Sequence, residues 1–311
     1  MMRSSGHLTF ERLVHSDWSS NAPKRWSACA LRRQGGWLVE RVAQTPSSDA
    51  FLDELFGHAK PTLAGFDFQI GLPLAWLGRI GAGFREFVCS PQAQHFLQPA
   101  DTLFRISPLQ PFYRKHPAGG RRADLLRALE CSTFDQLLRD CDRPTSCRSR
   151  AESIFWTVGA KQVGKAALAG WQDILIPALE RGAALWPFDG MLAALQGPAL
   201  TIAETYPAEA YQHIGMRRTI GKRTQTGRRE GCAAMFAWAA RHGIQFSSDV
   251  EEKLHDGFGP RKDGEDPFDA LAGLCGMIEV VDGRRAEAPV TAPLSFPREG
   301  RILGQIDLPC A

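Results

Sequence analysis

The chain has 311 residues, of which 44% are apolar and 23% charged, and its formal net charge is +3 at pH 7. This balance is ordinary for a soluble globular protein, and it neither requires nor excludes a nucleic-acid partner. No run reaches the roughly 18 apolar residues of a membrane-spanning helix, and the first residues lack the apolar stretch of a signal peptide. We therefore expect a cytoplasmic protein with reduced cysteines and no membrane contact.

The N-terminal part of the sequence predicts strands. Three segments are expected to be strands, namely residues 9–17, 25–34 and 37–44. The Gly35–Gly36 pair predicts a hairpin between the second and the third. Residues 48–58 then predict a short helix with Ser48 as its N-cap, and residues 62–71 predict a fourth strand.

The middle of the chain predicts helices that are often interrupted by proline and glycine. Between residues 75 and 198 the clearest example is an amphipathic helix at 164–182, which ends at Gly182. The apolar run at residues 198–207 predicts a fifth strand, with Glu204 near its end.

The C-terminal part predicts further helices. They are expected at residues 208–216, 232–243 and 266–281. A basic, polar loop at 217–231 separates the first two. The last helix has Asp266 as its expected N-cap and Pro267 in the favoured first position, and the tail from Asp282 is rich in proline.

Strands that alternate with helices after an initial meander predict an α/β fold, with a mixed sheet flanked by helices. The length suits one large domain with a sizeable insertion. We place this domain at residues 1–285, with its core at 10–75 and 198–285 and a largely helical insertion at 76–197. Residues 286–311 are expected to form a C-terminal tail.

Four acidic residues stand in apolar sequence at matching places in the predicted elements. They are Asp17 near the end of the first strand, Asp67 inside the fourth, Glu204 near the end of the fifth, and Asp269 in the first turn of the last helix. Carboxylates on adjacent strands repel one another, and a divalent cation relieves that repulsion. Each acid also has a local alternative, such as a turn cap, a salt bridge or an interaction with the helix dipole.

Four segments carry a resemblance to a known family: "HSDWSS", "GFDFQIGLP", "AETYPAEAYQ" and "DPFDALAGL". In this order they resemble the motifs of an uncharacterised family of predicted RNase H-like nucleases. The resemblance covers the core, and the insertion is matched only loosely. It implies a mixed five-stranded sheet in which strands 1 to 3 are antiparallel and strands 4 and 5 run parallel to strand 1. In that topology Asp17 and Asp67 face each other.

The resemblance also implies a site. Asp17, Asp67, Glu204 and Asp269 would be catalytic, and these four together with Asp266 would bind Mg²⁺ or Mn²⁺. Two such ions can stabilise the attacking and the leaving oxygen of a phosphodiester displacement.

Several basic residues are candidates for contact with substrate phosphates. Lys161 and Lys165 lie in one predicted helix, and Arg217 and Arg218 begin the basic loop. This loop predicts contact with a nucleic-acid backbone, although an ordinary surface loop has the same composition.

The function predicted on this basis is that of a metal-dependent nuclease, which is a hydrolase of phosphodiester bonds. Two alternatives stay open. One is a non-catalytic module of the same fold that binds nucleic acid or a protein partner. The other is a small-molecule phosphotransferase, for which the short "QGG" turn is thin support.

Overall fold

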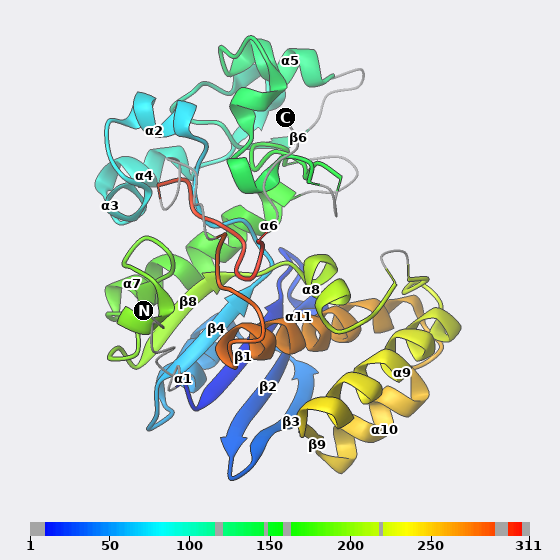
Figure 1. The fold of residues 1–311 in the computed structure, drawn as a ribbon. Helices are drawn as coiled ribbons and strands as arrows, with labels where there is room; N and C mark the ends of the chain where they lie inside the picture. Colours follow the sequence, from blue (N-terminus) through cyan, green and yellow to red (C-terminus); the bar gives the residue numbers. More distant parts are fainter. Residues whose placement is uncertain are drawn as a thin grey trace.

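The computed structural model describes residues 10–115, 121–145, 149–157, 163–217, 220–289 and 298–306. A mixed seven-stranded sheet, in the order β7-β8-β4-β1-β2-β3-β9, forms its centre (Figure 1). The strands of this sheet are β1 (Arg12–Asp17), β2 (Trp26–Arg33), β3 (Gly36–Gln44), β4 (Thr62–Phe66), β7 (Ala184–Leu185), β8 (Leu200–Glu204) and β9 (Gln245–Phe246).

The pairing of the long strands agrees with the predicted directions. β1, β2 and β3 form an antiparallel meander, while β4 is parallel to β1 and β8 is parallel to β4. The β2–β3 hairpin turns at Gly35 and Gly36, which both have positive φ. The prediction of five strands is wrong at the two edges, where β7 and β9 are added. Each added strand has two residues, too few for a recognisable alternation.

One face of the sheet is covered by α11 (Glu265–Val281), which lies across the strands in orange in Figure 1. Three other helices pack on the same side, α8 (Pro207–His213), α9 (Gln225–His242) and α10 (Ser248–Asp256). Nearly all of α11 is buried, as expected for a helix that is apolar all round. Its N-cap is Gly264, so the expectation of Asp266 in that role is wrong, and Asp269 lies in the second turn.

The opposite face packs against α1 (Ser48–Phe56) and against the segment between β4 and β8. Ser47, not Ser48, is the N-cap of α1, and its side chain accepts a hydrogen bond from the Ala50 N–H. The β4–β8 segment contains α2 (Leu74–Ile80), α3 (Phe84–Val88), α4 (Pro91–Phe96), α5 (Arg122–Ala128), α6 (Val163–Gly170), α7 (Ile176–Glu180), and a small sheet of β5 (Ala100–Thr102) and β6 (Tyr113–Lys115).

The helix predicted at 164–182 is divided into α6, a π-helical turn over Trp171–Leu175, and α7. The division precedes Pro177, which has no N–H to donate into the preceding turn. The apolar core of the β4–β8 segment is continuous with that of the sheet, because Gly170 packs directly on Phe68.

The C-terminal segment 298–306 is part of the packed structure, in contrast to the predicted irregular tail. Ile302 forms a parallel bridge with Glu204, and the Leu303 N–H donates to the Glu204 carbonyl. In Figure 1 this segment, in red, runs between the sheet and the β4–β8 segment.

Candidate functional site

Asp17 and Asp67 lie side by side at the carboxyl ends of two neighbouring parallel strands. Asp17 is the last residue of β1. Asp67 follows directly after β4, which ends at Phe66, so the prediction that Asp67 lies inside this strand is wrong. Ser16 pairs with Phe66 in the register of the two strands, so the next residue on each strand projects to the other face of the sheet. That face is the one that α11 covers.

The two carboxyl groups share a hydrogen bond, and both have a raised pKa. Burial raises the pKa of Asp17 well above its usual range, and the charges of Asp67 and Asp269 raise it further. Burial likewise raises the pKa of Asp67 to about 6, although the hydrogen bonds it accepts from the Trp18 N–H and from Asp17 lower it. The Trp18 nitrogen lies 2.7 Å from Asp67 Oδ1. One proton is therefore shared between the two carboxyl groups.

Asp269 comes to the same place from α11, where Gly273 allows the helix to lie close to β1. A Cβ added to Gly273 would lie 2.2 Å from the imidazole ring of His15. The side chain of Asp269 accepts hydrogen bonds from the Tyr211 hydroxyl and from Lys222 Nζ, which also pairs with Glu265 at 3.1 Å. We refer to Asp17, Asp67 and Asp269 together as the acid cluster.

The polar neighbours of Asp269 have shifted pKa values as well. Burial raises the pKa of Asp269, and the contacts with Lys222 and Tyr211 oppose that shift. Burial and the charge of Asp269 raise the pKa of Tyr211, so that its phenol stays protonated. Burial lowers the pKa of Lys222, but Asp269 and Glu265 more than compensate and the net shift is upward. Asp269 is therefore balanced by a cation, in contrast to Asp17 and Asp67.

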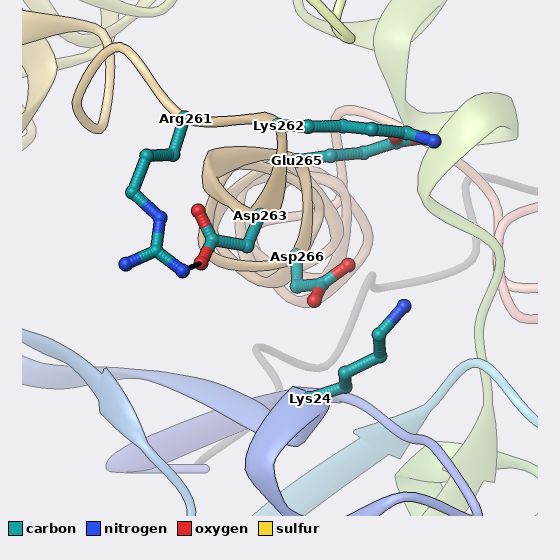
Figure 2. A pocket seen from close by; sticks show the side chains of 6 residues that line it. All are labelled: Lys24, Arg261, Lys262, Asp263, Glu265 and Asp266. Carbon is teal, nitrogen blue, oxygen red and sulfur yellow. Dashed lines mark ion pairs between the residues drawn. The ribbon is translucent and has the colours of Figure 1, made fainter.

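A hollow of about 320 Å³ lies at the N-terminal end of α11 (Figure 2). Six residues line it: Lys24, Arg261, Lys262, Asp263, Glu265 and Asp266. Asp266 links the hollow to the cluster, because its charge acts on Asp17 and that of Asp269 acts on it. Burial raises the pKa of Asp266 to about 6, with Lys24 acting in the opposite direction.

Glu204 lies apart from the acid cluster, which corrects the expectation that it joins the other acids. It pairs with Phe66 in the strand register, so its side chain points to the opposite face from that of Asp67. There it binds the buried Arg139 through two contacts, of 2.6 and 2.7 Å. The Ile70 N–H donates to the same carboxylate. The row of Asp17 and Asp67 continues with Thr205, directly after β8, whose N–H donates to the Phe66 carbonyl.

The basic candidates lie away from the acid cluster or outside the described residues. Lys161 and Arg218 are outside the described ranges. Lys165 is exposed on α6, a helix of the β4–β8 segment on the other side of the sheet. Arg217 is exposed and lines a different hollow, together with Glu230.

The predicted basic loop at 217–231 is in part helix, because α9 begins at Gln225. Arg228, within that helix, is completely buried and is therefore no surface contact for nucleic acid. Its guanidinium donates to four backbone carbonyls, those of Lys222, Gly257, Gly259 and Arg261. Arg228 thus fixes the backbone that carries Lys222 to the acid cluster and Arg261 to the hollow.

The partners of the acids are not evident from the sequence. The sequence indicates no role for Tyr211, and Lys222 is one of several cations in the basic loop. Both lie more than 40 residues from Asp269 along the chain. No local pattern connects residues at such separations. The one available signal is that Tyr211 lies in the short helix "PAEAYQH", which follows the fifth strand and so begins near this end of the sheet.

The described residues contain no group of three or more Asp, Glu, His or Cys side chains that is arranged to hold a metal ion. The chemistry of the acid cluster nevertheless suits a hard divalent cation, since its donors are carboxylate oxygens. Within the same ranges, neither Asp17 nor Asp67 is among the salt-bridged acids, whereas Asp269 binds Lys222.

Comparison of the chain with protein-family models, curated proteins and solved structures finds no match. The RNase H-like resemblance therefore stays a prediction.

No helix within the described ranges has both the length and the apolar character needed to cross a bilayer. Six cysteines in those ranges are free thiols, Cys29, Cys89, Cys131, Cys141, Cys232 and Cys275. The cytoplasmic location also stays a prediction.

Proposed function

We propose that this chain is a divalent-metal-dependent hydrolase of phosphodiester bonds, a nuclease of RNase H-like fold. The observation that supports it is the meeting of Asp17, Asp67 and Asp269, from three elements, at the carboxyl ends of two central strands of a mixed sheet. Burial and mutual repulsion raise the pKa values of these acids, and a bound divalent cation is what relieves such repulsion.

In this proposal the acid cluster binds Mg²⁺ or Mn²⁺, with Asp266 at its rim. The bound metal would activate a water molecule for attack on phosphorus and stabilise the departing oxygen. Lys222 and Tyr211 orient the Asp269 carboxylate, and Lys222 balances its charge before metal binds. Asp17 and Asp67 would hold the cation in place of the proton that they share. Glu204, held by Arg139, takes no part.

The decisive test is cleavage of labelled single-stranded and duplex DNA and RNA in the presence of Mn²⁺. We expect cleavage by the wild type that EDTA abolishes, and a loss of about 100-fold or more in Asp17→Asn and Asp269→Asn. The asparagine at position 17 still donates a hydrogen bond to Asp67, so this variant is expected to fold. Asp53→Asn is the matched control, because Asp53 is an exposed acid that pairs with Arg181 on the other side of the sheet. Full cleavage by both cluster variants refutes the proposal.

A second candidate is a non-catalytic module of the same fold that binds nucleic acid. The salt bridge between Lys222 and Asp269 favours it, since an internal cation already neutralises one of the three acids. Titration calorimetry with Mn²⁺ separates the two candidates. The hydrolase binds Mn²⁺ and loses this binding in Asp17→Asn, whereas the module shows no such binding.

A further inference from the structure

The hollow at the N-terminal end of α11 is built by two segments that also carry the acids. Lys24 ends the short helix Ala22–Lys24, which lies in the connection that follows Asp17. The short helix Lys262–Gly264 contains Lys262 and Asp263, and Arg261 directly precedes it. This helix leads directly into α11. A ligand in the hollow is therefore adjacent to Asp266 and, one helical turn further on, to Asp269.

The cations of the hollow differ in how they are engaged. Arg261 forms a 2.8 Å ion pair with Asp263, drawn as a dashed line in Figure 2. Lys24 and Lys262 are exposed, and in the described part of the chain neither is a member of a salt bridge within 4 Å. Figure 2 shows the Lys24 side chain reaching across the hollow toward Asp266. Neither ammonium group is held in an ion pair there, although the charge of Lys24 acts on Asp266, and both can contact an external anion.

The lining determines which anion fits. All six side chains are charged, and no aromatic or large apolar side chain is among them. The hollow therefore offers nothing on which a base can stack, and nothing to hold an apolar ligand. Its acids also disfavour a compact multiply charged anion. A chain of single negative charges that passes along the rim, as in a nucleic-acid backbone, is bound by lysines in this setting.

We propose that Lys24 and Lys262 bind the phosphates of a nucleic-acid strand next to the bond held at the acid cluster, without regard to base sequence. This inference rests on the proposed nuclease function and specifies where its substrate lies. The phosphodiester backbone reaches the cluster over the hollow, and Asp266 marks the boundary between the binding and the reacting part of the strand.

The test is direct binding in EDTA, where no metal-dependent cleavage occurs. Fluorescence anisotropy follows labelled oligo(dT) and oligo(rU) of about 20 nucleotides over roughly 50 to 200 mM salt. We expect Lys24→Gln and Lys262→Gln each to weaken binding about fivefold and to reduce the slope of log K against log salt by about 0.7. Lys60→Gln is the control, because Lys60 is an exposed lysine preceding β4, at the opposite end of that strand from Asp67.

Each outcome distinguishes this inference from the nuclease proposal. If the two hollow variants lose binding but Mn²⁺ never supports cleavage, the hollow is a nucleic-acid site and the nuclease proposal fails. If the wild type cleaves while both hollow variants bind and cleave like it, the nuclease proposal holds and this inference is wrong. Absence of wild-type binding to both oligonucleotides, or an equal loss in Lys60→Gln, also overturns it.

Discussion

The side-by-side placement of Asp17 and Asp67, which share a proton, lowers the stability of the folded protein. Two buried carboxyl groups at the ends of adjacent strands destabilise the native state whenever both are ionised. The described residues provide no salt bridge to Asp17 or Asp67 that offsets this cost. Lys222 pairs with Asp269 instead. Residues that reduce stability in this way are common at functional sites, because binding and catalysis require charges that folding alone would exclude.

We predict that Asp67→Asn stabilises the protein at neutral pH. The pKa of Asp67 is raised from 3.8 to about 6 on folding, so the folded protein binds more protons than the unfolded chain between these values. The free energy of unfolding of the wild type therefore falls as the pH rises through this window. Asparagine does not titrate and still accepts from the Trp18 N–H, so the variant gains about 1 to 2 kcal/mol above pH 7 and little below pH 4.

Urea denaturation of both proteins between pH 4 and pH 8 measures this difference. Asp53→Asn, at an exposed position on α1, serves as the control and should differ little from the wild type over the whole range. A stability difference that is independent of pH would show that folding leaves the pKa of Asp67 unchanged, and one that grows toward acid would show that folding lowers it.

The identity of the acids was accessible from sequence, but their surroundings were not. Asp67 and Asp269 stand out because apolar residues flank them, and Asp17 because it ends an apolar strand; both are local signals. Glu204 gives the same local signal but points to the other face of the sheet, since it lies one residue before the row that Thr205 occupies. Successive residues of a strand point to opposite faces of the sheet. An error of one residue in the predicted position therefore reverses the face on which a side chain lies.

At the scale of single elements, the contact between α11 and β1 determines the distance of Asp269 from the other two acids. The helix approaches the strand at Gly273, where the completely buried ring of His15 fills the place of a side chain. Burial lowers the pKa of His15 to about 3, so the ring is neutral and packs like an aromatic residue. Small residues in a helix permit such an approach where a Cβ would prevent it.

We predict that Gly273→Ala lowers the free energy of unfolding by about 1 to 3 kcal/mol, because the added methyl group forces α11 away from His15. Gly78→Ala, in the exposed part of α2, is the control: its Cβ would have no atom within 4 Å, and alanine is the better helix former. Thermal unfolding should therefore show opposite shifts of the midpoint. A stabilising effect at both positions would mean that α11 has room to accept a side chain.

The helices and strands with strong periodicity were predicted, and their termini were not. The five longer strands and α11 follow from apolar runs punctuated by glycine and proline. The errors lie where long-range contacts decide, as in the division of the helix around Pro177, the two-residue strands β7 and β9, and the N-terminal turn of α9. These features depend on neighbours that the local sequence does not contain.

At the scale of the whole molecule, the segment 298–306 connects parts that are distant in sequence. Ile302 extends the sheet beside the end of β8. Glu299 accepts hydrogen bonds from the N–H groups of Leu74, at the start of α2, and of Asp140. A Cβ at Gly71 would lie 1.9 Å from the Glu299 carbonyl oxygen, so the backbones are in direct contact. The composition of this region predicted an irregular tail because proline content gives no information on such contacts.

We predict that Glu299→Ala costs about 1 to 3 kcal/mol of stability, since it leaves the N–H groups of Leu74 and Asp140 without their acceptor. Glu251→Ala, at an exposed position of α10, should change stability by less than about 0.5 kcal/mol. Chemical denaturation of the two variants measures both values. Equal stability of the two would show that water replaces the Glu299 carboxylate at no cost.

The burial of α11 against the first strands has a consequence for synthesis. The central strands of the sheet are complete by residue 66, yet the helix that covers their inner face begins only at residue 265. A growing chain must therefore keep an apolar sheet surface uncovered while about two hundred further residues are made, which is the situation in which chaperones bind nascent proteins. Because Asp269 arrives with that helix, the three carboxylates cannot meet before α11 has left the ribosome.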